Sequence, residues 1–275
     1  MAKIKKEQIL GTNFSYTGHR LSYWFESMKR LDVSRVEFYG CAPHCYLYDV
    51  TPERAYSLSR QLKENGLEVC VFTPEQCDYP ISTSINDYRV RERSLEYYEK
   101  ALDVASVLES PYMQMVTGGG YIGDDPEEDF QRTVDAMYRI IRRAEKLGIT
   151  IVLESDPTTS VANTEDALRL INIINSPNLE FLIDTNGLMG ANEDFETALV
   201  KMAPHVKHMH FIDAIGPQHC LIPGTGELPL EEDLEIMAAH GYTGTLTPEL
   251  WGSRYKKCCE DAMRQSLEFL RSRAE

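Results

Sequence analysis

The chain has 275 residues, 43% of them hydrophobic and 26% charged, which is the composition of an ordinary soluble enzyme with one large core. Its formal net charge of −15 argues against a nucleic-acid-binding protein, which needs a surface of clustered Lys and Arg. No apolar run has the length of a membrane span, the N-terminus lacks the features of a signal peptide, and the seven cysteines form no Cys-x-x-Cys motif. We therefore expect a cytoplasmic protein with reduced thiols and no membrane partner.

Short apolar segments typical of strands alternate with amphipathic segments typical of helices along the whole chain. The predicted strands cover residues 9–16, 35–40, 68–74, 112–117, 150–155, 179–184, 206–213 and 244–250. The predicted helices cover residues 21–31, 52–65, 87–109, 126–147, 164–174, 193–202, 229–240 and 255–273. Eight alternating units predict an α/β protein, a (β/α)8 TIM barrel in which residues 1–275 form a single domain.

Residues that start and stop helices support this assignment. Thr51 and Asp125 each precede a proline, a pairing typical of a capped first helical turn. Gly66, Gly148 and Gly241 each lie between a predicted helix and the next predicted strand, where a glycine commonly ends the helix.

Four of the predicted strands carry a side chain that can bind a metal near their C-terminal end. These side chains are Glu154, Asp184, His210 and Glu249. Parallel barrels place their active sites at this rim, so we expect the four groups to meet there. Three carboxylates buried together without a cation would repel one another, and a divalent cation removes that cost. Carboxylates with one imidazole suit Mn²⁺, Mg²⁺ or Co²⁺ better than a structural zinc site, although Zn²⁺ is also possible. The opposing interpretation is four independent structural roles.

The same residues predict chemistry on a sugar. A cation with open coordination positions can polarise a ketone and stabilise the enediolate formed when the adjacent C–H loses its proton. Glu154 and Glu249 lie on well-separated strands, so one can remove a proton from one face of that carbon while the other returns it on the opposite face.

Other rim residues are candidates for substrate binding. His44 and Glu75 follow the second and third predicted strands, and His208 shares one side of its strand with His210. Asp213 is either a partner of the metal ligands or a loop cap. The turn at residues 223–226 lacks the lysine of a phosphate-binding P-loop. We therefore expect it to form part of the pocket wall.

These motifs resemble the sugar phosphate isomerase/epimerase superfamily, the xylose isomerase-like barrels, over nearly the whole chain. The resemblance rests on the four strand-end residues, on His208 and Asp213, and on the turn at 223–226. Segments 36–40, 43–44, 73–75, 79–80, 91–95 and 222–226 are most similar to the fructoselysine 3-epimerases. The resemblance implies a Mn²⁺-type ion held by Glu154, Asp184, His210 and Glu249, and it implies 3-epimerisation of a 2-ketose by the two glutamates.

Two positions differ from the ketohexose 3-epimerase pattern. Gly187 stands where those enzymes have a histidine, and residues 214–221 lack their arginine. The resemblance therefore implies a substituted ketose as substrate, with Asn186 or His219 replacing the lost contacts. It also implies a homodimer or homotetramer. The alternatives are a metal-dependent lyase or C-glycoside-cleaving enzyme acting on a 3-keto sugar, a DNA-repair endonuclease that the net charge of −15 disfavours, and a non-catalytic sugar-binding protein.

Overall fold

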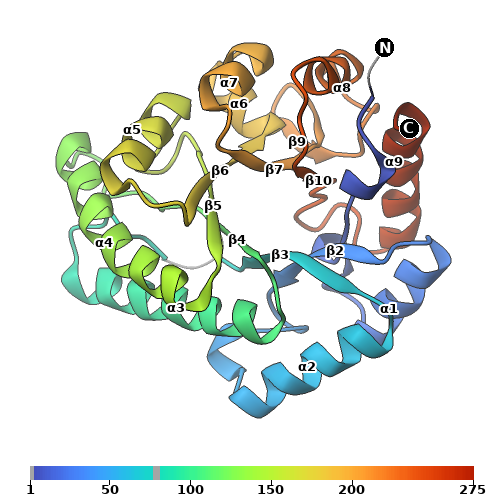
Figure 1. Cartoon of the computed structure of the whole chain (residues 1–275), viewed down its shortest axis with the longest axis horizontal. Coiled ribbons are helices and arrows are strands. Elements are labelled where there is room, and N and C mark those ends of the chain that lie inside the picture. Colours follow the sequence, from blue (N-terminus) through green and yellow to red (C-terminus); the bar gives the residue numbers. More distant parts are fainter. Residues whose placement is uncertain (1–2, 77–80) are drawn as a thin grey trace.

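The computed structural model describes residues 3–76 and 81–275, and its central feature is a ring of parallel strands surrounded by helices (Figure 1). Cys77, one of the seven cysteines, and the segment 79–80, which carries part of the family resemblance, lie outside the described residues. The strands of the ring are β1 (Gly11–Thr12), β2 (Arg35–Gly40), β3 (Glu68–Pro74), β4 (Tyr112–Met115), β5 (Thr150–Glu154), β6 (Leu179–Asp184), β7 (Val206–His210) and β10 (Thr245–Thr247), neighbours in that order.

The ring closes between its first and last strands. A parallel bridge joins Ile9 to Leu246, and the backbone N–H of Leu10 donates to the carbonyl of Leu246 at 2.9 Å. The predicted (β/α)8 TIM barrel is therefore confirmed. Closure brings β10 beside β1, so residues from the two ends of the chain face the same interior.

Helices follow the strands and form the outer layer (Figure 1). They are α1 (Leu21–Arg30), α2 (Pro52–Glu64), α3 (Tyr88–Val107), α4 (Pro126–Leu147), α5 (Thr164–Ile174), α6 (Thr185–Ala191), α7 (Phe195–Met202), α8 (Leu230–Ala239) and α9 (Cys259–Arg273). The predicted caps are present: the side chain of Thr51 accepts from the N–H of Arg54, and that of Asp125 accepts from the N–H of Glu127. Gly148 ends α4 at a φ of 67°, a left-handed conformation that glycine adopts without strain.

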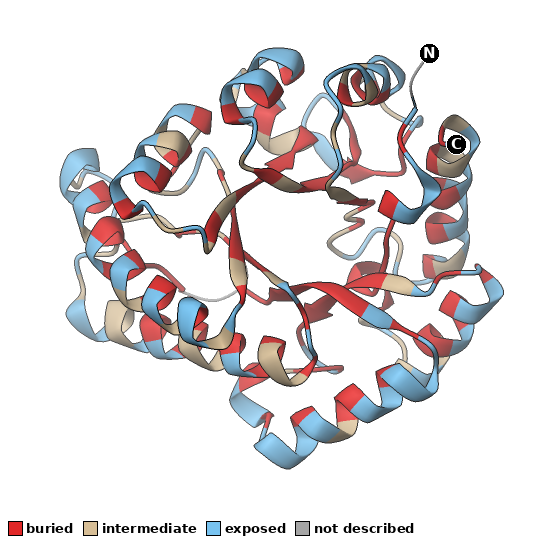
Figure 2. Cartoon of the chain, viewed as in Figure 1, coloured by how far each residue is buried: buried red, intermediate tan, exposed pale blue. Residues whose placement is uncertain are grey.

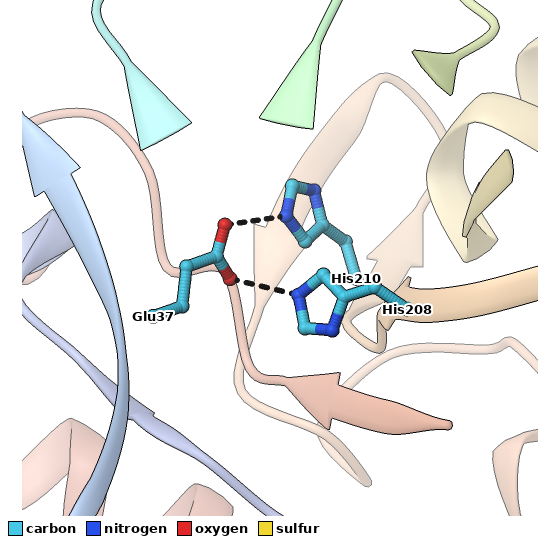
Figure 3. Close-up of side chains that lie close together, drawn as sticks. All are labelled: Glu37, His208 and His210. Atoms are coloured by element: carbon cyan, nitrogen blue, oxygen red, sulfur yellow. Dashed lines mark hydrogen bonds and ion pairs between the residues drawn. The ribbon is translucent and has the colours of Figure 1, made fainter. Parts of the chain in front are cut away.

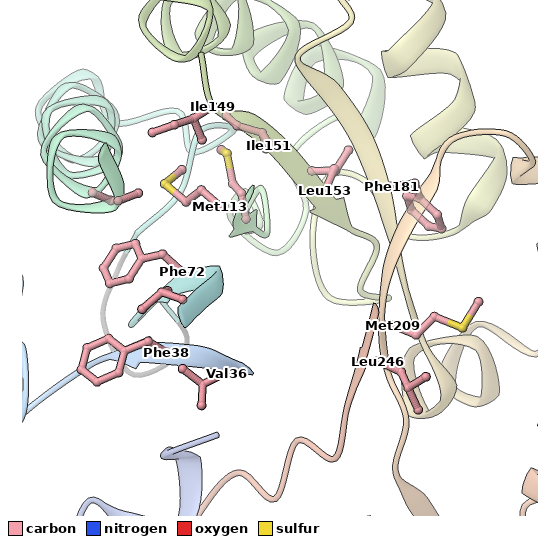
Figure 4. Close-up of a cluster of buried hydrophobic side chains, with 14 of the residues drawn as sticks. Val36, Phe38, Phe72, Met113, Ile149, Ile151, Leu153, Phe181, Met209 and Leu246 are labelled. Carbon is pink, nitrogen blue, oxygen red and sulfur yellow. The ribbon is translucent and has the colours of Figure 1, made fainter. Parts of the chain in front are cut away.

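Alternation along each strand separates the core from the barrel interior. Apolar side chains at every second position pack outward against the helices, and Figure 4 shows part of this cluster, including Leu153, Phe181 and Met209. Figure 2 shows that the strands are largely buried and that the helices are exposed on their outer faces. The positions between the outward residues point into the barrel, where Val152 and Leu182 belong to a small separate apolar cluster. Glu154 and Asp184 lie one alternation further toward the C-terminal rim.

The structure differs most from the predicted elements at five places. The strand at 9–16 is shorter because residues Phe14–Tyr16 form a 3-10 helix. The strand at 206–213 ends at His210, and an antiparallel hairpin of β8 (Asp213–Ile215) and β9 (Gln218–Leu221) follows it. The strand at 244–250 covers only Thr245–Thr247, the final helix begins at Cys259, and α6 was not predicted. Each error lies at or near the C-terminal rim, where loop contacts decide the conformation.

The structure also bears on membrane-spanning helices and on the state of the cysteines. Within residues 3–76 and 81–275, no helix combines the length and the apolar character needed to cross a bilayer. Among the same residues, five cysteines are free thiols: Cys45, Cys70, Cys220, Cys258 and Cys259.

Candidate metal centre and active site

The four predicted metal ligands meet around a single ring nitrogen. Nδ1 of His210 lies 3.7 Å from Oε2 of Glu154, 4.0 Å from Oδ2 of Asp184 and 3.6 Å from Oε2 of Glu249. The residues come from β5, β6, β7 and the segment after β10, four neighbouring positions in the ring. Chain segments about a hundred residues apart thus present one imidazole and three carboxylates to a common point.

Local structure explains how Asp184 serves two purposes. It is the last residue of β6 and the N-cap of α6, and its Oδ1 accepts from the backbone N–H of Asn186 at 2.6 Å. Its other oxygen, Oδ2, is the one that faces His210. The start of α6 therefore fixes the orientation of the carboxylate at the rim of the barrel.

Burial makes this cluster electrostatically demanding. Burial and the nearby carboxylate of Glu154 raise the pKa of Asp184 to about 8, and burial also raises the pKa of Glu249 well above its ordinary value. Burial raises the pKa of Glu154, but the interaction with His210 outweighs it and leaves that pKa below its ordinary value. Burial lowers the pKa of His210, whereas the surrounding carboxylates raise it more, so the pKa lies well above its ordinary value. Burial and mutual repulsion therefore disfavour the ionised forms of Asp184 and Glu249, and a bound cation would stabilise those forms.

The residues fit a divalent cation. Nδ1 of His210 is buried and has no hydrogen-bond partner within residues 3–76 and 81–275, an unusual state for a polar atom in a protein interior. Ligand atoms of Glu154, Asp184 and His210 all lie within 4.8 Å of one another. Carboxylate oxygens and one imidazole are donors that divalent transition metals and Mg²⁺ accept.

The opposite side of His210 faces a carboxylate that the sequence analysis did not place in the site. Figure 3 shows the carboxylate of Glu37 facing two imidazoles, with one oxygen directed at each. Nε2 of His210 lies 3.0 Å from Oε1, and Nε2 of His208 lies 3.1 Å from Oε2. The side chains of all three residues are fully buried. Strand alternation predicts that Glu37 points into the barrel from β2. It does not predict the contact with His208 and His210, because these residues lie on β7 and not on a strand next to β2.

A pair of amides on the opposite half of the barrel holds Glu154. Gln114 of β4 donates to Oε2 of Glu154, and Gln76 donates to the amide oxygen of Gln114. Gln76 is itself held by the hydroxyl of Tyr98, which donates to its amide oxygen at 2.8 Å. The sequence analysis missed these amides because a lone glutamine at the end of a strand carries no catalytic signature.

Above this cluster a cavity of about 740 Å³ opens at the rim, and Glu154, Asp184 and Glu249 line it. Phe14, Tyr39 and Trp251 form an aromatic wall of the same cavity. The rings of Phe14 and Tyr39 stack at 4.5 Å, and the indole of Trp251 donates to the hydroxyl of Tyr39 at 3.2 Å. The volume is in the range of pockets that enclose a small organic ligand.

Comparison with known proteins identifies the architecture. A profile described as the xylose isomerase-like TIM barrel matches residues 25–273. The chain belongs to this family.

Individual members of the family are similar over most of their length. The fructoselysine 3-epimerase of Escherichia coli O157:H7 is 25% identical over 241 residues, covering 85% of this chain and 87% of that protein. The structure of a 3-keto-D-glucoside 4-epimerase from E. coli superposes with a TM-score of 0.79 at 18% identity, covering 96% of this chain and 99% of that one. The structure of D-psicose 3-epimerase from Clostridium cellulolyticum H10 with D-tagatose gives a TM-score of 0.77 at 16% identity, covering 97% and 99%.

These similarities confirm the predicted resemblance to the xylose isomerase-like barrels and to fructoselysine 3-epimerase. At 16% and 18% identity the two solved structures show the shared fold alone. With the curated epimerases among its relatives, the chain is an isomerase-class enzyme of the sugar epimerase/isomerase type.

The predicted substrate contacts of this family member divide into two groups. Asn186 and His219 line the cavity beside the carboxylates. Both polar atoms of the Asn186 side chain are buried without a hydrogen-bond partner in the described structure. His44, Glu75 and His208 are not among the cavity's lining residues in the part of the chain that the structure describes. Contact with substrate stays a prediction for all five.

Each of the other three has a partner in the surrounding protein. Nε2 of His44 lies 2.9 Å from the carbonyl of His19, and burial lowers the pKa of His44. Glu75 accepts a hydrogen bond from Tyr39, the residue of the aromatic wall. His208 lies in the barrel interior against Glu37.

Asp213 organises the loop that covers the barrel. It is buried and accepts backbone N–H groups from Ala214, Gly224, Gly226 and Leu228 at 2.8 to 3.1 Å. Of the two roles left open by the sequence, this geometry favours the loop cap. The cap fixes the turn at 223–226 against the hairpin that carries His219.

Proposed function

We propose that the chain is a metal-dependent 3-epimerase that acts on a substituted 2-ketose of the fructoselysine kind through an enediolate. The observation that carries the proposal is the convergence of Glu154, Asp184 and Glu249 on the unpartnered Nδ1 of His210, at the floor of a cavity. Such a cluster lowers the stability of the folded protein, so its presence supports a functional role.

The four converging side chains would hold the cation, and Mn²⁺ is the ion that we propose. When bound, the ion would supply a Lewis acid that draws electron density from the ketone and makes the adjacent C–H more acidic. The protein's contribution is to hold the ligands in place before substrate arrives. Asp184 is held by the start of α6 and Glu154 by Gln114.

Glu154 and Glu249 would transfer the proton. They reach the cavity from strands separated by β6 and β7 in the ring, so they approach a bound ketose from different sides. One carboxylate takes the proton from C3 on one face, and the other carboxylic acid returns a proton on the opposite face. In the reverse reaction the two residues exchange roles. A reversible epimerase therefore needs two carboxyl groups that can both reach C3.

The cavity's composition supports a substituted sugar without phosphate. No lysine or arginine is among the residues that line it within 3–76 and 81–275, whereas Glu154, Asp156, Asp184 and Glu249 are. A phosphorylated ketose would meet uncompensated negative charge there. Gly187 contributes no side chain to the wall, which leaves room for a substituent beyond the ketose itself.

Solvent deuterium exchange tests the proposal directly. The Mn²⁺-loaded enzyme would be incubated in D₂O with fructoselysine, D-fructose and D-psicose, and each sugar followed by NMR. We expect deuterium at C3 and formation of the C3 epimer, fastest with fructoselysine. Absence of exchange at C3 in every ketose would contradict the proposal, and loss of the substituent instead of epimer formation would support the lyase alternative. The cytoplasmic location and the homo-oligomeric state stay predictions from the sequence.

A further inference from the structure

We propose that Glu37 is a positioning residue that keeps the proton of His210 on Nε2 and thereby leaves Nδ1 free to bind a cation. The inference rests on the metal site of the proposed function but not on the identity of the sugar. It concerns the side of His210 that faces away from the cavity, where Glu37 and His208 lie (Figure 3).

The direction of the hydrogen bonds follows from the chemistry of the groups. An ionised carboxylate accepts hydrogen bonds and donates none, so both Nε2 atoms that face Glu37 at 3.0 and 3.1 Å must carry protons. The hydroxyl of Thr73 also donates to Oε1, the oxygen that faces His210. Two donors directed at Oε1 stabilise the ionised form of Glu37. Because Glu37 is fully buried, water cannot replace either donor.

The tautomer of His210 decides what its other nitrogen can do. A neutral imidazole with its proton on Nε2 has a lone pair on Nδ1. When a cation neutralises the surrounding carboxylates, that lone pair is available to bind it. Nδ1 faces oxygens of Glu154, Asp184 and Glu249 at 3.6 to 4.0 Å and has no hydrogen-bond partner among the described residues. Without Glu37 the ring could carry its proton on Nδ1, hydrogen-bond a carboxylate and lose its capacity as a ligand.

His208 makes the arrangement rigid. Its Nδ1 lies 2.8 Å from the hydroxyl of Thr245 on β10, while its Nε2 contacts Glu37 on β2. The rings of His208 and His210 stand nearly perpendicular, with an interplanar angle of 88°. The network therefore ties three strands together beneath the cavity, and neither imidazole can rotate without breaking a buried hydrogen bond.

The same three residues could instead surround a second cation, because ligand atoms of Glu37, His208 and His210 lie within 4.8 Å of one another. The distances favour protons, since both nitrogen–oxygen pairs have the length of a hydrogen bond. Thr73 occupies a further acceptor position of Glu37. The number of cations bound per chain separates the two interpretations.

Metal affinity measured without substrate tests the inference. Isothermal titration with Mn²⁺ would compare the wild type, Glu37→Gln and Glu37→Ala, with thermal unfolding as a check of the fold. Glu37→Gln keeps one acceptor oxygen, so we expect about tenfold weaker binding, and Glu37→Ala keeps none, so we expect about a hundredfold loss. The matched control is Glu180→Gln, because Glu180 pairs with His205 at 2.8 Å near the opposite end of the barrel. It should bind Mn²⁺ like the wild type.

Nitrogen NMR of ¹⁵N-histidine-labelled protein loaded with the diamagnetic ion Zn²⁺ gives a second readout. We expect the proton of His210 on Nε2 and none on Nδ1. Wild-type affinity in either folded Glu37 variant, a proton on Nδ1 or two cations per chain would overturn the inference; if Glu37→Ala does not fold, Glu37→Gln and the NMR spectrum decide. A wild type that binds one Mn²⁺ as expected but exchanges no ketose proton would refute the proposed function and leave the role of Glu37 intact.

Discussion

The two halves of the barrel contribute differently to the site. Strands β5, β6 and β7 and the segment after β10 supply the four predicted metal ligands: Glu154, Asp184, His210 and Glu249. The half built from β1 to β4 supplies the groups that surround and orient them: Phe14, Glu37, Tyr39, Gln76 and Gln114. Under the proposed function, the half that supplies the ligands would carry the reaction and the other would set orientation and shape. Four variants or treatments test how strict this division is.

Removal of the cation should have the largest effect. Treatment with a chelator is expected to reduce ketose exchange to the background rate, and added Mn²⁺ should restore it, because the ion is needed to acidify the C–H bond. The measurement is deuterium incorporation together with metal analysis of the same sample. Full exchange in a sample shown to hold no metal would mean that Glu154 and Glu249 transfer the proton without a cation.

Glu249→Gln should separate catalysis from metal binding. The amide keeps an oxygen for the cation but cannot carry the proton, so we expect exchange to fall by about 10² to 10⁴ while the fold and most of the metal remain. Glu227→Gln, at an exposed position of the neighbouring loop, is the control and should change nothing. Near-normal turnover of Glu249→Gln would remove this residue from catalysis.

Gln114→Met tests the orienting half. Methionine approximates the length of glutamine but cannot donate to Glu154, so this carboxylate should lose its fixed orientation. We expect kcat to fall by about 10- to 100-fold with little change in thermal stability. Gln131→Met, on the exposed part of α4, provides the comparison. If kcat is unchanged, the half built from β1 to β4 shapes the cavity but does not position the proposed catalytic groups.

Asp233 of α8 is a buried carboxylate away from the cavity, and it tests how far burial alone lowers the free energy of unfolding. Burial, with the charges of Glu232 and Asp194, raises the pKa of Asp233 in α8 to about 7 from an ordinary value of 3.8. An aspartate with a raised pKa in the folded state destabilises the protein at pH values above that pKa, and the penalty fades as the pH falls toward the ordinary value.

Asp233→Asn should therefore increase the free energy of unfolding by about 2 kcal/mol at pH 8 and by much less near pH 4.5. Urea denaturation at the two pH values measures the difference. An equal gain at both would show that ionisation of Asp233 is not the cause. The effect is the smallest of the four and involves no catalytic group.

The outer layer of the barrel was predictable because its signals are local. Period-two alternation along β5 and β6 places Leu153 and Phe181 outward and Glu154 and Asp184 inward, and both patterns can be read along one strand. Helix caps such as Asp125 and Gly148 act within a few residues. The wrong boundaries are different in kind: the β8–β9 hairpin depends on Asp213, whose carboxylate binds backbone groups as far away as Leu228.

The sequence by itself determined that this chain alternates strands with helices and that carboxylates and an imidazole end the strands of its second half, because residue type and spacing decide both. Only the tertiary structure decided that Glu37 lies against His208 and His210 and that Gln114 holds Glu154. The reason is geometric. Which side chains meet inside a closed barrel depends on the register between strands and on closure of the ring, and no local pattern of residues encodes a contact between positions 37 and 210.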